Sequence, residues 1–101
     1  MDFFEMERVI EELARTIAAP SATTWFKLTS NKEPTCEEYR RKVVEFINLF
    51  EDSLCSGYKD IQNSDDLLDF VKKRVKDQSK SVLSGNNKEV EKRYKYYVNY
   101  G

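Results

Sequence analysis

Four stretches of the chain carry large apolar residues three or four positions apart, and this spacing places them on one side of an α-helix. The stretches cover residues 2–19, 35–56, 64–84 and 88–99. The second has the longest regular series, which consists of Tyr39, Val43, Ile47, Phe50 and Leu54. A β-strand would instead alternate with a period of two. The pattern predicts an all-α fold, an irregular four-helix bundle whose apolar sides share one core.

Residues that start and stop helices are few, and they fall between these stretches. Three glycines and two prolines in 101 residues are too few for the turns of an all-β domain. Thr35 and Glu38 have the spacing of a capping box, and Gly57 and Gly85 follow the second and third helices as expected left-handed exit residues. The length suits one domain, so we expect a single helical domain over residues 1–101.

Pro20 is expected to end the first helix, because proline lacks the N–H that a helix requires and its ring clashes with the preceding turn. Residues 21–34 would then form a structured, aromatic-containing loop with Trp25 and Phe26 between the first two helices. Three interpretations are open. The loop covers the core as a lid, it contains a helical turn around residues 24–28, or Trp25 is exposed and marks a contact site. We favour the lid, because a large ring hides most of its area in a typical fold.

The residue types that most enzymes use are missing. The chain has no histidine, which excludes a Ser-His-Asp or Cys-His arrangement and removes the commonest zinc ligand. Its cysteines, Cys36 and Cys55, would lie about five turns apart on one helix, too far for a disulfide. Its glycines are scattered and form no phosphate-binding loop. We therefore expect a protein that is not an enzyme, with no catalytic, cofactor-binding or metal-binding residues and no small-molecule substrate.

Nothing in the sequence suggests a membrane. No segment approaches the roughly 20 apolar residues of a membrane span. The first residues, "MDFFEMERVIEEL", carry acids where a signal peptide carries bases. Two cysteines without a disulfide framework fit a reducing compartment. We expect no membrane contact and an intracellular location, cytoplasmic or nuclear.

Charge is distributed unevenly along the chain. Residues 1–70 carry 15 acidic and 8 basic side chains, whereas residues 71–101 carry 3 acidic and 9 basic ones. If the last two helices pack antiparallel across the "SGNN" turn at residues 84–87, their lysines and arginines form one continuous basic surface. In the last helix, Tyr94 and Tyr97 fall on the apolar side, and Tyr96 and Tyr100 fall on its flank.

The composition favours a non-catalytic protein-protein interaction domain, acting as a small subunit, adaptor or inhibitor-type protein. The chain has more large aromatic side chains than a core of this size needs, so some are expected at the surface, where they anchor interfaces. The expected partner is another protein, in a hetero-complex or a homo-oligomer.

The alternative is an electrostatic binder of nucleic acid or of an acidic or phosphorylated peptide through the basic C-terminal helices. Nucleic acid is the less favoured partner, because the net charge of the chain is −1 and counterion-driven binding needs a stronger basic excess. The candidate partner-binding residues are Trp25, Phe26, Lys73, Arg74, Lys92, Arg93, Lys95, Tyr96 and Tyr100.

Overall fold

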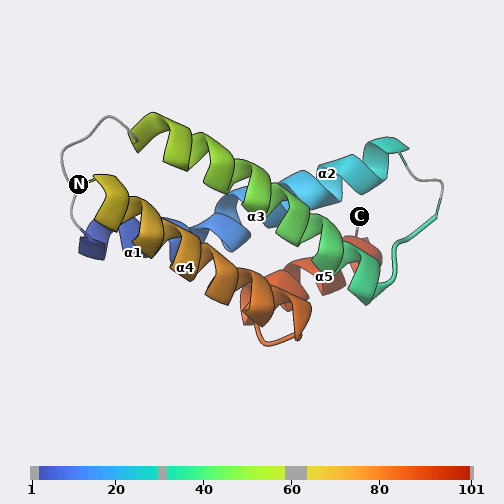
Figure 1. Ribbon diagram of the computed structural model, residues 1–101. Coiled ribbons are helices and arrows are strands. Elements are labelled where there is room, and N and C mark those ends of the chain that lie inside the picture. The colour runs from blue at the N-terminus through green and yellow to red at the C-terminus, as the bar shows by residue number, and fades with distance from the viewer. Residues whose placement is uncertain (1–2, 30–31, 59–63, 101) are drawn as a thin grey trace.

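The computed structural model describes residues 3–29, 32–58 and 64–100, and 91% of them are helical with none in a strand (Figure 1). The all-α fold expected from the sequence is therefore confirmed. The elements are α1 (Phe3–Leu13), the π-helical segment η1 (Ala14–Ala18), α2 (Ala19–Thr29), α3 (Cys36–Tyr58), α4 (Ser64–Leu83) and α5 (Lys88–Tyr100). Because α1, η1 and α2 follow one another without a break, they form a single rod, and the bundle has four helical bodies.

The aromatic loop expected after Pro20 is wrong as far as Thr29, because α2 occupies Ala19–Thr29. Proline disrupts a regular α-helix through its missing N–H and its clash with the carbonyl four residues earlier. Here the turn before Pro20 is π-helical, and the N–H of Ala19 bonds to the carbonyl of Ala14, five residues back. Such a wide turn leaves room for the ring, so the rod continues through Pro20 without the hydrogen bond that its missing N–H would make.

The other helix boundaries follow local hydrogen-bonding chemistry. The capping box of α3 is confirmed: Glu38 N–H donates to Thr35 Oγ1 at 3.1 Å, and Thr35 N–H donates to Glu38 Oε1 at 2.9 Å. The helix α4 ends at Leu83 and is followed, as expected, by a left-handed Gly85, whose φ is +82°. Gly57 differs from the expectation, since α3 continues to Tyr58 and Gly57 has no positive φ.

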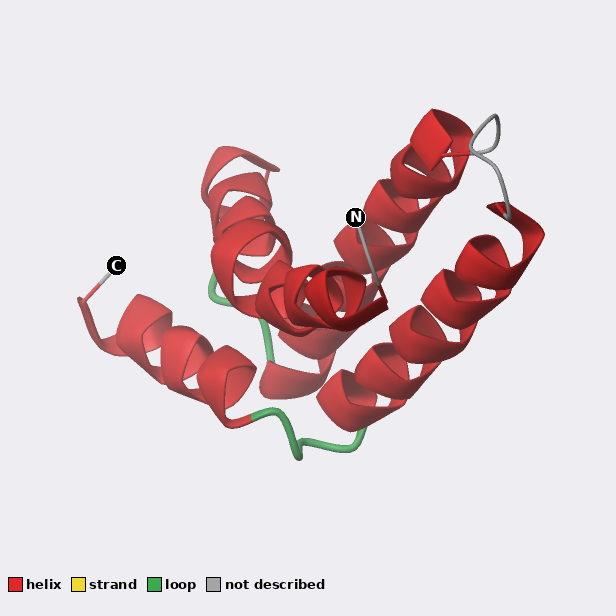
Figure 2. Cartoon of the chain, turned by 90° about the vertical axis from the view of Figure 1, so that its left-hand side faces the viewer, coloured by secondary structure: helices red, strands yellow, loops and turns green. Residues whose placement is uncertain are grey.

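The rod and α3 cross near η1, and the shorter helices α4 and α5 pack at opposite ends of this crossing. The helix α4 packs against α3 and α1, whereas α5 packs against α2, α3 and η1. From the turn at Gly85, α4 and α5 lead away from each other (Figure 2). The result is an elongated molecule with principal extents of 47 × 24 × 17 Å.

The core lies where these four bodies meet. Its buried apolar residues are Met6, Ile10, Leu13, Ala14, Ala18, Ala19, Ala22, Phe26, Tyr39, Val43, Ile47, Leu67, Val71, Val75, Val82 and Val90. Among the described residues, no helix is both long and apolar enough to cross a membrane.

Tyr39 joins three of the four bodies. Its ring is fully buried, and its hydroxyl donates to the carbonyl of Ala19 at 3.1 Å and lies 2.9 Å from Thr23 Oγ1. The rings of Tyr94 and Tyr97 from α5 lie 5.4 and 6.3 Å from it, centroid to centroid. Because burial raises the pKa of the Tyr39 phenol, this hydroxyl stays a donor at neutral pH. The contacts fix α5 against the N-terminal parts of α2 and α3.

Candidate protein-binding surface on helix α2

The π-helical segment changes which side of the rod faces solvent. In a regular helix, Ile17 would lie below Leu13 on the buried side, as the sequence spacing predicts. In the π-helical turn the hydrogen bond spans five residues, so Ala18 follows Leu13 by one turn on the same side of the rod, and Ala19 follows Ala14 in the same way. All four residues are buried. Ile17 is consequently turned outward and is 41% exposed.

Helix α2 therefore has two apolar sides. Its inner side buries Ala19, Ala22 and Phe26 in the core. Its outer side exposes 38% of Trp25 and 81% of Leu28. Of the two aromatic residues of α2 that were predicted to bind a partner, Trp25 lies at the surface and Phe26, 7% exposed, is a core residue. The expectation for Phe26 is thus corrected, because the helix that replaces the loop points adjacent residues in different directions.

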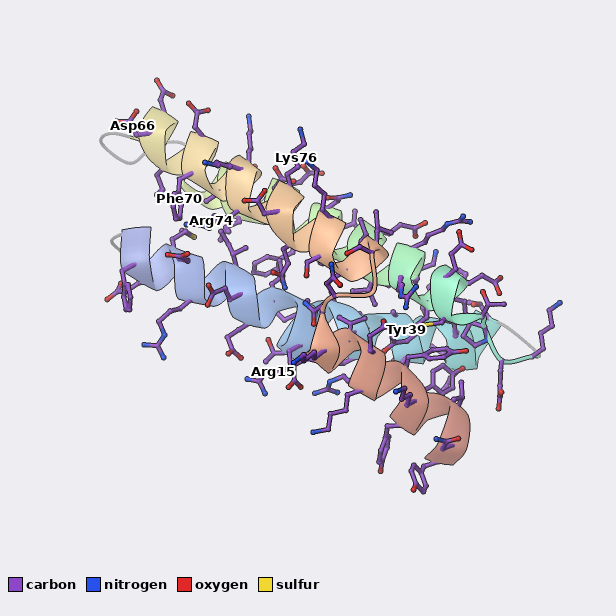
Figure 3. All side chains as sticks on the ribbon, turned by 90° about the horizontal axis from the view of Figure 1, so that it is seen from below. Arg15, Tyr39, Asp66, Phe70, Arg74 and Lys76 are labelled. Carbon is purple, nitrogen blue, oxygen red and sulfur yellow. The ribbon has the colours of Figure 1, made fainter. Side chains whose placement is uncertain are left out.

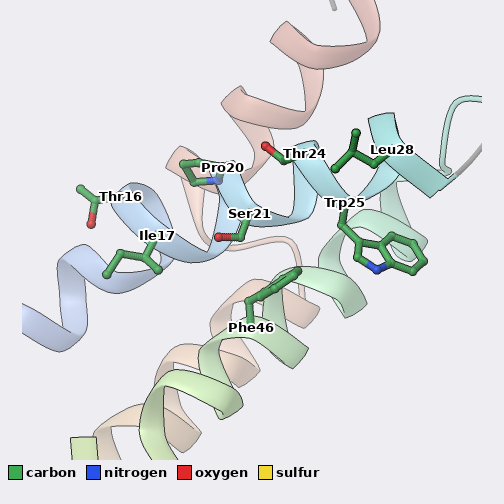
Figure 4. Close-up of a pocket in the computed structure, with 8 residues that line it drawn as sticks. All are labelled: Thr16, Ile17, Pro20, Ser21, Thr24, Trp25, Leu28 and Phe46. Carbon is green, nitrogen blue, oxygen red and sulfur yellow. The ribbon is translucent and has the colours of Figure 1, made fainter. Parts of the chain in front are cut away.

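A hollow of about 530 Å³ lies along this outer side of α2 (Figure 4). Phe46 points into it from α3, and Thr16, Ser21 and Thr24 are its polar lining. The large and apolar lining residues define what we call the α2 apolar surface, namely Ile17, Pro20, Trp25, Leu28 and Phe46.

Neighbouring side chains hold Trp25 in place. Lys42 Nζ lies 3.7 Å from the centroid of the Trp25 ring, a cation–π contact, and the same Nζ is 2.5 Å from Glu45 Oε2. The ring of Phe26 meets the Trp25 ring edge to face at 5.1 Å between centroids. A ring fixed in this way loses little side-chain entropy on binding, which is the property of an interface anchor.

One sequence signal marks this surface. Residues 16–26, "TIAAPSATTWF", contain no charged side chain, although 35% of the whole chain is charged. An uncharged run of this kind fits a loop, a buried helix or a binding surface equally well, and only the register of α2 distinguishes them.

The helices α4 and α5 do not pack against each other along their lengths, so the condition for a single continuous basic surface is not met. Both helices pack on α3, but α4 also packs on α1 whereas α5 packs on α2 and η1, and the two diverge from their shared turn (Figure 2). Arg74 lies between α4 and α1 (Figure 3), where it pairs with Glu7 at 2.9 Å and stands 5.4 Å from the Phe70 ring centroid. Lys73 is exposed on α4. Both candidates of α4 thus lie apart from those of α5.

A second hollow, of about 710 Å³, brings together most of the candidates on α5. It lies between α2 and α5 and contains Lys92, Arg93, Tyr96 and Tyr100, to which α2 adds Lys27. Tyr96 and Tyr100 are exposed, with ring centroids 5.1 Å apart, whereas Tyr94 and Tyr97 pack against the core, as their positions in the sequence predict. Lys95 is exposed on α5 outside this hollow.

The surroundings of the two thiols favour their protonated form. Burial and the Glu91 carboxylate, 3.6 Å from Cys36 Sγ, raise the pKa of the Cys36 thiol. Burial also raises the pKa of the Cys55 thiol. A raised pKa keeps a thiol protonated, and only the thiolate is reactive. In the part of the chain that the structure describes, no three histidine, cysteine or acidic side chains gather in a way that could hold a metal ion.

No protein-family model, curated protein or solved structure matches this chain. What can be said of its function therefore depends on its own surfaces.

Proposed function

We propose that this protein is a non-catalytic helical interaction domain whose α2 apolar surface receives an α-helix of a partner protein. The observation that carries the proposal is the outer side of α2, where Ile17, Trp25 and Leu28 are exposed together beside Phe46. A subunit, adaptor or inhibitor would all use such a surface.

The core does not require these exposed residues. The buried residues of all four helical bodies already form one continuous cluster, and Ile17, Trp25 and Leu28 lie outside it. Fully burying one large aliphatic side chain contributes about 1.5–3 kcal/mol. A partner that covers Ile17 and Leu28 and packs on Trp25 would therefore gain several kcal/mol from this surface. Tryptophan is also among the residues most enriched at binding hot spots.

The shape of the surface suits a helix. Ile17 and Leu28 are eleven positions apart, which is about 16 Å along the rod. Between them lie Ser21 and Thr24, so the middle of the hollow is lined by small side chains. A helix of about three turns can lie in such a groove and place side chains at both ends, as amphipathic helices do in other apolar grooves.

Trp25 provides a direct test, because it is the only tryptophan in the chain. The partner is isolated with the tagged protein from its native source, purified, and titrated against the protein while tryptophan emission is recorded. Docking on the α2 apolar surface should shift the emission of Trp25 to shorter wavelength. Leu28→Glu should weaken binding about tenfold or more, which corresponds to about 1.4 kcal/mol.

The matched control is Leu83→Glu, which places the same charge on α4 at a leucine that is 48% exposed. This variant should bind like the wild type. Equal affinity of Leu28→Glu and the wild type for the partner would contradict the proposal. Sedimentation equilibrium of the protein alone identifies the partner as a second copy of this chain if it dimerises and Leu28→Glu dissociates the dimer.

A further inference from the structure

The α2 apolar surface and the hollow between α2 and α5 are neighbours. Pro20 and Thr24 line both, so that α2 forms the wall between an apolar hollow on one side and a basic one on the other. A ligand that lies on α2 and is wider than its outer side will reach into the second hollow as well.

The second hollow carries an excess of positive charge. Lys27, Lys92 and Arg93 line it together with a single carboxylate, that of Glu89. Among the residues that the structure describes, no carboxylate lies within ion-pair distance of any of the three cations. Cations that are close together and not neutralised by neighbours attract an anionic ligand.

Tyrosines complete the lining. Tyr96 and Tyr100 stand side by side on α5, and Lys27 Nζ lies 5.8 Å from the centroid of the Tyr97 ring. A phenol supplies both an apolar ring and a hydroxyl that donates a hydrogen bond to a carboxylate. The hollow therefore suits acidic groups attached to a segment that also has apolar parts.

From this arrangement we infer that the partner segment is an acidic amphipathic peptide, whose carboxylates bind Lys27, Lys92 and Arg93 while its apolar side chains fill the α2 apolar surface. The inference rests on the proposed function and specifies the chemistry of its partner. Charge complementarity across such an interface sets both the association rate and the choice of partner.

A nucleic acid fits the same hollow less well. The exposed lysines of α4, such as Lys73, lie away from it, so the described residues form no long basic track for successive phosphates. A phosphate backbone bound there would also leave the adjoining apolar surface uncovered.

The test uses two synthetic helical peptides of about five turns with leucines at spacings of three and four. One carries glutamates at all other positions and the second carries lysines there. Each is titrated against the full chain while Trp25 emission is recorded, and a single-stranded oligothymidine is titrated in parallel. The glutamate peptide should bind about tenfold or more tightly than the lysine peptide and should weaken steeply with added salt.

Lys92→Glu with Arg93→Glu should reverse this preference and favour the lysine peptide. Lys72→Glu with Lys73→Glu is the matched control, since it makes the same change in charge at two exposed positions of α4, and it should leave the preference unchanged. The inference is overturned if the two peptides bind equally, if neither binds, if the α5 charge reversal has no effect, or if the oligothymidine binds more tightly than the glutamate peptide.

Failure of the inference is distinguishable from failure of the proposed function. If Leu28→Glu abolishes peptide binding and the α5 charge reversal leaves it unchanged, the acidic partner is refuted and the α2 apolar surface is retained. Binding that responds to the charge reversal but ignores Leu28→Glu would refute the α2 apolar surface.

Discussion

Replacing Gly85 with alanine tests two features of the turn between α4 and α5 at once. Gly85 has a φ of +82°, a conformation that residues with a Cβ rarely adopt. Its N–H donates to the carbonyl of Val82 at 3.1 Å, and the N–H of Asn86 donates to that of Ser81 at 3.0 Å, which together form a Schellman motif. A Cβ at Gly85 would lie only 2.7 Å from Nη2 of Arg40.

The cost has two parts. Forcing a non-glycine residue into the left-handed conformation costs about 1–2 kcal/mol. The Cβ also displaces the Arg40 guanidinium, which holds α3 to α5 by two hydrogen bonds to Glu91, one of them 3.0 Å long. Loss of this partly buried pair costs about 1 kcal/mol more. The sum of about 2–3 kcal/mol corresponds to a fall in Tm of about 10–20 °C for a domain of this size.

Urea unfolding monitored by circular dichroism measures this loss. Gly57→Ala is the control, because Gly57 lies in α3 without a positive φ and a Cβ there meets nothing within 4 Å; it should cost nothing and gain up to about 1 kcal/mol. In an Arg40→Met background, Gly85→Ala should cost only the backbone part, about 1–2 kcal/mol. If Gly85→Ala unfolds at the same urea concentration as the wild type, the account of this turn is refuted.

Three further predictions concern stability and are checked by the same unfolding measurement. Ile47→Ala, in the core, should lower the free energy of unfolding by about 2–5 kcal/mol, whereas Leu49→Ala, two positions away and exposed, should change it by no more than about 0.5 kcal/mol. Equal losses would show that the buried side of α3 is assigned wrongly. Thr35→Ala removes the cap of α3 and should cost about 1 kcal/mol. The hydrogen bond from Arg40 lowers the pKa of Glu91, so the stability it contributes is complete above the ordinary glutamate pKa and is lost as the pH falls through the lowered one. The difference in unfolding free energy between the wild type and Glu91→Gln should therefore shrink on acidification, and a constant difference would contradict this account.

Features set by neighbouring residues were predictable from the sequence. The capping box at Thr35, the left-handed exit at Gly85 and the buried sides of α3 and α4 depend on spacings of a few residues, and they lie where the pattern places them. The all-α fold class follows from the same spacings, since no segment shows a competing period of two.

The candidate surface was less predictable, because it depends on a departure from that period. The π-helical segment adds one residue to a turn, which moves Ile17 out of the core and lets the rod pass Pro20. Single-residue preferences give no sign of such a turn, so a loop was the reasonable expectation for Trp25. The directions of α4 and α5 depend on contacts far apart in the sequence, such as those of Tyr39 with Tyr94, and the spacing within either helix does not contain them.

The wide turn at residues 14–18 also restricts how the length of this chain can change. Deleting one residue there would close the turn into a regular helix in which Ala18 still follows Leu13 by one turn, so α2 would keep its orientation relative to α1. Deleting a second residue, or inserting one, would rotate α2 by about 100°. Such a rotation would turn Phe26 toward water, whereas the single deletion would bring the Pro20 ring against the carbonyl four residues before it. Any relative that shares the fold should therefore have either the same number of residues from Leu13 to Phe26 or one fewer, the shorter form lacking the proline.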